Sequence, residues 1–170
     1  MSLSKEDRLR NADEALQLML ELLGNKIIST FEFDIDKPPF EGQAYPTTWK
    51  YLEDQGLIER RDTLADRRCA LTGMGWLSGL QAIGAHRSPE LTEQVGRIMS
   101  VLKNLVKGRQ EMAFANAVAV AEEANVPVGL VYNIIDSHYI LSVLGRIEAA
   151  WYETGGFLIE VPVDFGLEEL

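Results

Sequence analysis

The sequence predicts a mainly α-helical protein with small β-hairpins, an α+β fold. Apolar residues recur at the 3.6-residue spacing of a helix in several stretches, among them 5–23 and 91–105. Short stretches with strand patterning lie between turn residues, and the clearest two flank a polar turn at 62–68. With 170 residues, 46% of them apolar, the chain is long enough for one domain or two small ones.

Turn and breaker residues separate the elements of the first half. Gly24 ends the first amphipathic helix, and a Pro-Pro pair excludes a helix directly after the alternating residues 31–35. Pro46 precedes a second helix, and Gly56 is placed to cap the C-terminus of that helix. We therefore expect helices over 5–23, 47–55 and 74–84, a strand over 31–35, and a hairpin made of 57–61 and 69–72.

The second half predicts a similar succession of elements. Small residues, a proline and the helix-capping residue Ser88 mark a boundary, so we expect domains at 1–85 and 86–170. The alanine-rich stretch 111–124 predicts a helix, and Thr154-Gly155-Gly156 predicts a hairpin turn. The expected elements are helices over 91–105, 111–124 and 128–144 and strands over 147–152 and 157–163.

One stretch of about a fifth of the chain has a more specific pattern. Gly56 to Arg61 is followed by Asp66-Arg67-Arg68 and then by Leu71 to Gly75, so that a helix leads into a hairpin with a basic turn. This is the element order of a winged helix, and residues 46–80 resemble the wing region of MarR-type and PadR-type regulators. The resemblance implies a winged helix-turn-helix fold, and the order of elements in the second half predicts two of them in tandem.

The resemblance implies a DNA-binding transcriptional regulator. In that family a recognition helix enters the major groove, and the basic wing lies on phosphate or in the minor groove. Double-stranded DNA would then bind the N-terminal half, and a homodimer would form through the terminal helices. The candidate DNA-binding residues are Thr47, Thr48 and Lys50 on the helix and Arg60, Arg61, Arg67 and Arg68 on the wing.

The charge distribution keeps a second hypothesis open, an acidic tandem winged-helix adaptor that binds a protein and no DNA. The net charge of the chain is −10, and residues 50–68 hold five basic and five acidic residues. Residues 86–170 carry six basic and twelve acidic residues, and 128–144 contain no Lys or Arg. A protein partner would therefore bind the C-terminal half. Each of these residues also has a purely structural interpretation, in which the arginines pair with nearby acids, the threonines cap a helix, and the aromatic residues fill the core.

The sequence carries no signature of catalysis or of a cofactor. It has none of the phosphate-binding, dinucleotide-binding, nucleophile-elbow or zinc-protease motifs, and we expect it not to be an enzyme. Cys69, His86 and His138 do not have the spacing of zinc ligands, so no metal is expected. No stretch of about 18 apolar residues and no signal-peptide pattern occurs, which predicts a cytoplasmic protein with no membrane partner.

Overall fold

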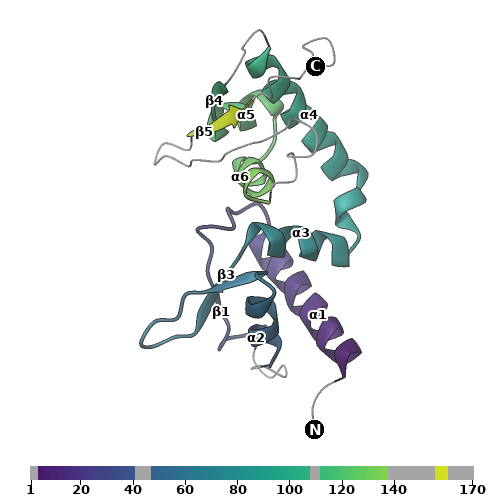
Figure 1. Cartoon of the computed structure of the whole chain (residues 1–170), viewed down its shortest axis with the longest axis vertical. Helices are drawn as coiled ribbons and strands as arrows, with labels where there is room; N and C mark the ends of the chain where they lie inside the picture. Colours follow the sequence, from purple (N-terminus) through teal and green to yellow (C-terminus); the bar gives the residue numbers. More distant parts are fainter. Residues whose placement is uncertain (1–3, 41–46, 108–111, 138–155, 161–170) are drawn as a thin grey trace. The chain divides into compact units, whose positions relative to one another are not determined.

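The computed structural model has a mixed α+β fold that divides into two compact units (Figure 1). Unit 1 is Met1–His86 and unit 2 is Arg87–Leu170. Each unit combines helices with a small antiparallel sheet. The structure describes residues 4–40, 47–107, 112–137 and 156–160.

Unit 1 begins with helix α1 (Lys5–Leu23), which has the bounds expected from the sequence. The Ser4 side chain caps its N-terminus by accepting a hydrogen bond from the Asp7 backbone N–H at 3.0 Å. Gly24, with φ of 53°, ends the helix. One face of α1 is buried and packs against α2 (Thr47–Asp54) and α3 (Gly73–Ala82). The buried residues of α1 are Ala12, Ala15, Leu16, Met19 and Leu23.

The sheet of unit 1 has three antiparallel strands in the order β1-β3-β2. These are β1 (Phe33–Asp34), β2 (Ile58–Arg60) and β3 (Arg68–Leu71). Strand β3 is central, with Cys69 opposite Phe33 on one side and opposite Arg60 on the other. Both expected strand regions of this half are therefore present, although the first is only two residues long.

Aromatic side chains join the sheet of unit 1 to helix α2. Phe31, Phe33, Phe40 and Trp49 form a chain of edge-to-face contacts, with ring centroids 4.9, 6.1 and 5.4 Å apart. Phe40 and Trp49 are both almost fully buried. Phe40 and Trp49 thus contribute to the core of unit 1.

A close backbone contact fixes the start of helix α3. Thr72 caps the helix by accepting a hydrogen bond from the Gly75 N–H at 3.0 Å, and its hydroxyl donates to the Gly56 carbonyl at 2.6 Å. A Cβ atom at Gly75 would lie 1.8 Å from the Leu57 carbonyl oxygen. Only glycine lets the first turn of α3 approach the hairpin backbone this closely.

Unit 2 begins with helix α4 (Pro89–Val106), which follows a short 3₁₀ turn at Ala85–Arg87. Ser88 caps α4 by accepting a hydrogen bond from the Leu91 N–H at 3.2 Å, as the sequence predicted. The apolar stripe of the helix is buried and includes Leu91, Ile98 and Leu102. This stripe packs on helix α5 (Ala117–Ala124) and on strand β4 (Met112–Asn116).

The prediction of one helix over 111–124 was wrong. Residues Met112–Asn116 form β4, and α5 starts only at Ala117. The Asn116 side chain accepts hydrogen bonds from the N–H groups of Val118 and Ala119, which fixes the helix start. Strand β4 pairs antiparallel with β5 (Gly156–Glu160), so a partner some 40 residues away overrides the helix propensity of the alanines.

The end of unit 2 is described only in part. The expected helix over 128–144 is present as α6 (Val128–Asp136), which ends with Ser137 as its C-cap, and the expected residues from 138 on lie outside the described ones. The expected strand 147–152 also lies outside them, and β4 is the strand that pairs with β5. Among the described residues no single helix is long and apolar enough to cross a membrane.

Candidate nucleic-acid interface

The hairpin of unit 1 carries the four arginines that the sequence assigned to DNA. Strands β2 and β3 pair with Ile58 opposite Leu71, and the Arg61 N–H extends the ladder by donating to the Arg68 carbonyl at 2.8 Å. At the tip, the Thr63 N–H donates to the Asp66 carbonyl at 2.9 Å, and the Thr63 hydroxyl accepts from the Asp66 N–H at 3.0 Å. This closed turn leaves the Leu64 side chain fully exposed.

Two of the arginines pair with acids on or beside strand β2. Arg60 makes two hydrogen bonds to the Asp62 carboxylate, at 2.6 and 3.2 Å. Arg61 lies 3.1 Å from Glu59 and 3.8 Å from Glu32, and it also donates to the backbone carbonyl of Ser29 at 2.9 Å. Both guanidinium groups are therefore engaged within unit 1.

The other two arginines pair with acids that are close in space and, in part, distant in sequence. Arg67 donates to Asp36 through its guanidinium group, with Nε at 2.8 Å, and through its backbone N–H at 3.2 Å. Arg68 lies between Asp66, at 3.1 Å, and Glu32, at 3.5 Å. Asp36 and Glu32 belong to the β1 segment, so these pairs connect the hairpin to the strand beside it.

The helix residues assigned to the major groove differ in exposure and pairing. Thr48 is only 4% exposed and faces the core. Lys50 is exposed but pairs with Asp54, one turn along α2, at 3.0 Å. Thr47 lies at the exposed start of the helix. In this conformation, therefore, Thr48 does not reach a base edge, and Lys50 is already bound to a carboxylate.

The ion pairs change the proton affinities of their members. Hydrogen bonds from Arg67 and Arg60 hold the pKa values of Asp36 and Asp62, respectively, below the usual value of an aspartate. The same contact with Asp36 raises the pKa of Arg67. Asp54 likewise raises the pKa of Lys50. At neutral pH the carboxylates of Asp36 and Asp62 and the cations of Arg67 and Lys50 therefore stay charged. Each is part of an ion pair within unit 1.

The remaining candidate groups of unit 1 contribute to the core. Cys69 lies in the central strand with none of its surface exposed, and burial raises the pKa of its thiol to about 12. Trp76 is buried on α3. Within the described part of the chain no group of three or more His, Cys, Asp or Glu side chains could hold a metal ion.

The helix of unit 2 that the sequence offers as a recognition helix carries no Lys or Arg. Helix α6 follows α5 after the turn Asn125–Pro127, in which Asn125 has a left-handed φ of 51°. Its buried residues are Gly129, Val131, Asn133, Ile134 and Ile135. The helix has no Lys or Arg and mostly faces the interior, so it offers no cationic side chain to a phosphate.

Sequence reasoning missed the acids that pair with the arginines from a distance. Glu32 was not singled out, and Asp36 was interpreted as a solvated surface carboxylate, although both alternate with apolar residues along 31–36 and so share one side of a strand. That alternation was the available signal. A scan against protein-family models, a search of curated proteins and a search of solved structures each found no match.

Proposed function

We propose that this chain is a protein-interaction adaptor built from two winged-helix-like units, in which the wing of unit 1 does not bind DNA. The observation that carries the proposal is the pairing of all four wing arginines with carboxylates. Four cations stand beside five acids on this surface, so its local net charge is −1. The acids are Glu32, Asp36, Glu59, Asp62 and Asp66.

The placement of the acids matters more than the strength of each pair. An exposed ion pair contributes only about 0–1 kcal/mol, so a phosphate could displace one carboxylate from its arginine. The displaced carboxylates would remain a few ångströms from the phosphates and would repel them. A duplex gains affinity by releasing counterions where cations outnumber anions, and this surface has no such excess.

Strand order supports the winged-helix part of the proposal for both units. In unit 1 the strand after α1 pairs with the last strand of the hairpin, giving the order β1-β3-β2. In unit 2 the strand after α4 pairs in the same antiparallel way with the last described strand, β5. Helices α5 and α6 are joined by a three-residue turn with a bend of 119° between them, in the range of a helix-turn-helix.

The experiment that tests the proposal is duplex binding with a gain-of-function variant. The wild-type protein is titrated into a fluorescent random duplex of about 20 base pairs at low and at high salt, and anisotropy is measured. We expect no saturable binding. The triple variant Asp36→Asn, Asp62→Asn and Asp66→Asn should bind at low salt, because it leaves the arginines in place and removes three carboxylates from the surface.

A matched control separates local from global charge. The variant Glu90→Gln, Glu122→Gln and Glu123→Gln raises the net charge by the same amount on exposed positions of unit 2. It should bind duplex no better than the wild type. If instead the wild-type protein binds with a steep negative salt slope, and Arg67→Ala with Arg68→Ala flattens that slope, the DNA-binding regulator is correct and the adaptor proposal fails.

A further inference from the structure

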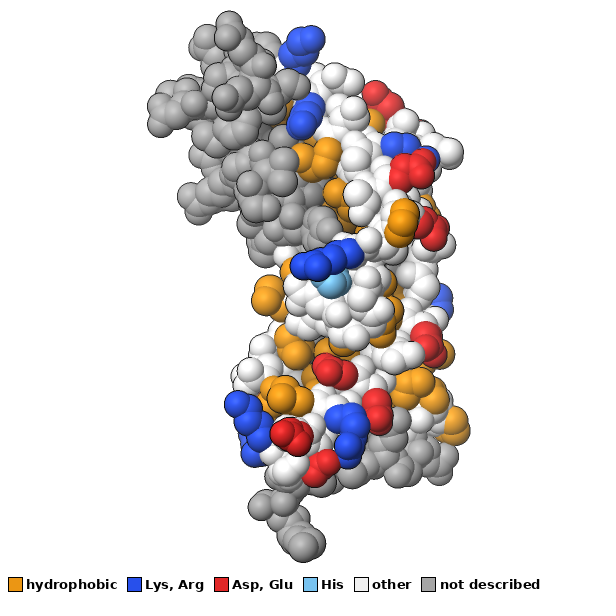
Figure 2. All heavy atoms as spheres, turned by 90° about the vertical axis from the view of Figure 1, so that its right-hand side faces the viewer, with side chains coloured by type: hydrophobic (Ala, Val, Ile, Leu, Met, Phe, Trp, Pro, Cys, Tyr) orange, Lys and Arg blue, Asp and Glu red, His pale blue; other side chains and the backbone are white. Residues whose placement is uncertain are grey.

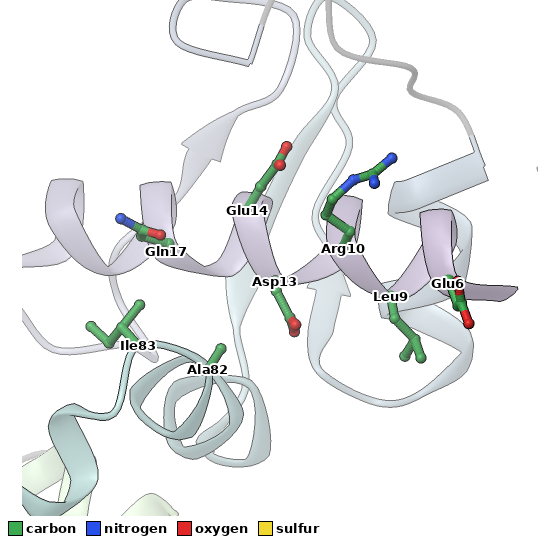
Figure 3. Close-up of a pocket in the computed structure, with 8 residues that line it drawn as sticks. All are labelled: Glu6, Leu9, Arg10, Asp13, Glu14, Gln17, Ala82 and Ile83. Carbon is green, nitrogen blue, oxygen red and sulfur yellow. The ribbon is translucent and has the colours of Figure 1, made fainter. Parts of the chain in front are cut away.

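A groove runs along unit 1 between helices α1 and α3 (Figure 3). Its larger hollow has a volume of about 390 Å³ and is lined by residues of α1 from Glu6 to Gln17 and by Ala82 and Ile83 at the end of α3. A second hollow of about 350 Å³ shares Leu9, Asp13 and Ala82 with it. The lining lies entirely within unit 1.

The groove exposes apolar side chains that the core of unit 1 does not use. Leu9 is 41% exposed and Ile83 is 44% exposed, on opposite walls of the larger hollow. Leu57 and Tyr51 line the second hollow and are partly exposed. Figure 2 shows apolar side chains at the surface of unit 1 among acidic and basic ones. The two hollows therefore expose apolar side chains from α1, α2, the segment after α2 and the end of α3, among polar and charged ones.

The charge at the rim of the groove is negative. In Figure 3, Leu9 and Asp13 project from α1 on the side of Ala82 and Ile83, whereas Arg10 projects from the other side. Arg10 pairs with Asp7 at 2.6 Å. Among the described residues, Glu6 and Asp13 make no ion pair, so both carboxylates remain available to a ligand.

We propose that this groove binds one basic amphipathic helix of a partner protein. The inference rests on the proposed adaptor function and gives that function a docking surface in unit 1, whereas the charge distribution of the sequence had favoured the C-terminal half for a protein partner. Apolar side chains of the partner would pack against Leu9 and Ile83, and its Lys or Arg residues would lie near Glu6 and Asp13. Residues 6 to 17 of α1 span about 16 Å at 1.5 Å per residue, so the groove matches roughly three turns of a partner helix.

The same charges select against a second copy of this chain as the occupant. In a two-fold symmetric contact through this groove, Glu6 and Asp13 of one copy would face the same acids of the other. Like charges brought together in this way disfavour association. A basic helix gains from the acids that repel a second copy.

The test uses the full chain and defined peptides. The probe is a fluorescent peptide of about 15 residues with Leu on one helical face and Lys elsewhere. A shuffled peptide of the same composition and a peptide with Glu in place of Lys serve as controls. We expect the basic amphipathic peptide to bind at least about 10-fold more tightly than either control at about 0.15 M salt. If it binds no better than they do, the proposal is overturned.

Variants locate the binding to the groove. Leu9→Ser and Ile83→Ser should each weaken binding by about fivefold and together by about 20-fold, because each removes a partly buried apolar contact. Leu22, at 42%, and Met74, at 55%, are equally exposed on α1 and α3 but do not line the groove. Leu22→Ser and Met74→Ser should leave the affinity unchanged. Equal effects of the two sets would overturn the proposal.

Charge variants test the rim separately. Asp13→Asn should weaken peptide binding by about two- to threefold and reduce its salt dependence, whereas Glu21→Gln, elsewhere on α1, should do neither. Equal effects of Asp13→Asn and Glu21→Gln would overturn the role of the rim charges. Circular dichroism of each variant verifies that the fold is retained, as expected for exposed positions.

Three further outcomes keep this inference distinct from the proposed function. If sedimentation shows a dimer that Leu9→Ser with Ile83→Ser dissociates, the occupant is a second copy and the basic-helix proposal is overturned. If the peptide fails to bind and the duplex also fails to bind, the groove proposal falls while the adaptor function stands. If the duplex binds with a steep salt slope, the adaptor function itself falls.

Discussion

The two units of this chain use a similar strand pairing with different surfaces. In each unit a long first helix leads into a strand that pairs antiparallel with the last described strand of the unit. Unit 1 carries basic residues on its hairpin, each neutralised by a carboxylate, whereas α6 of unit 2 carries none. A shared strand pairing is therefore no evidence for DNA binding in this chain. Function depends on which side chains each unit places on its surface.

The units also differ in what packs against their closely approached glycines, a backbone in unit 1 and an aromatic side chain in unit 2. At Gly75 of unit 1 an added Cβ would meet backbone, the Leu57 carbonyl. At Gly156 of unit 2 it would meet the Phe114 ring, with the nearest atom at 2.1 Å. A backbone contact cannot give way without moving a strand, whereas a ring can rotate. Unit 1 should therefore tolerate the loss of its glycine less well.

The largest expected effect is that of Gly75→Ala. The substitution should lower the free energy of unfolding of unit 1 by about 3 kcal/mol or more, because α3 must move away from the hairpin. Urea denaturation gives the loss, and hydrogen exchange over β2 and α3 assigns it to unit 1. Gly96→Ala is the control, since a Cβ at that helical position meets nothing within 4 Å and should be neutral or slightly stabilising.

Gly156→Ala should have a smaller effect in unit 2, about 1–2 kcal/mol. The Phe114 ring is half exposed, so it can turn toward solvent when the new methyl group displaces it. Hydrogen exchange of β4 should increase while that of β2 and β3 stays unchanged. A loss as large as that of Gly75→Ala would contradict the proposed difference between backbone and side-chain contacts.

The helix caps offer a third comparison. Thr72→Ala in unit 1 should cost about 1–2 kcal/mol and Ser88→Ala in unit 2 about 1 kcal/mol. Both substitutions remove a cap, but the Thr72 hydroxyl also donates to the Gly56 carbonyl and so connects α3 to the end of α2. The fall in melting temperature of each variant relative to the wild type compares the two costs. Equal costs would mean that this second hydrogen bond contributes no net stability.

The smallest expected effect concerns the wing pairs and pH. Since the pKa values of Asp36 and Asp62 are depressed in the folded state, their stabilising contribution is present above the unfolded pKa of about 4 and is lost as pH falls through the folded values. The wild type should therefore melt slightly higher than Asp36→Asn with Asp62→Asn at pH 6. The difference in melting temperature should shrink as pH falls and vanish below the folded pKa values. A difference that persists there would assign the effect to geometry and not to charge.

Local signals predicted most of the helices of this chain. The apolar spacing and the stop at Gly24 predicted the bounds of α1, although its capping residue Ser4 was not singled out. The capping residue Ser88 predicted the start of α4. Strand β4 was missed because Met112–Asn116 is stabilised by a partner at Gly156–Glu160, and no local propensity encodes that pairing. Asn116 followed by an alanine run was a capping signal that could have placed the start of α5.

The candidate site was less predictable than the fold. Counting charges along 50–68 predicted a balance of signs but not their arrangement. The arrangement depends on the β1-β3 pairing, which brings Asp36 to Arg67 across 31 residues of sequence. The groove between α1 and α3 is likewise a product of packing, because nothing in the periodicity separates Leu9, which stays exposed, from Leu16, which is buried.

The burial of Cys69 has a practical consequence for handling the protein. A thiol with a pKa of about 12 and no exposed surface is almost entirely protonated near pH 8 and is closed to reagents. Because it is the single cysteine of the chain, intact molecules should store in air without forming disulfide-linked dimers. When the sheet of unit 1 opens in a molecule, its Cys69 thiol would be exposed and could react once with a maleimide dye. The rate of labelling would then measure how often strand β3 separates from β1 and β2.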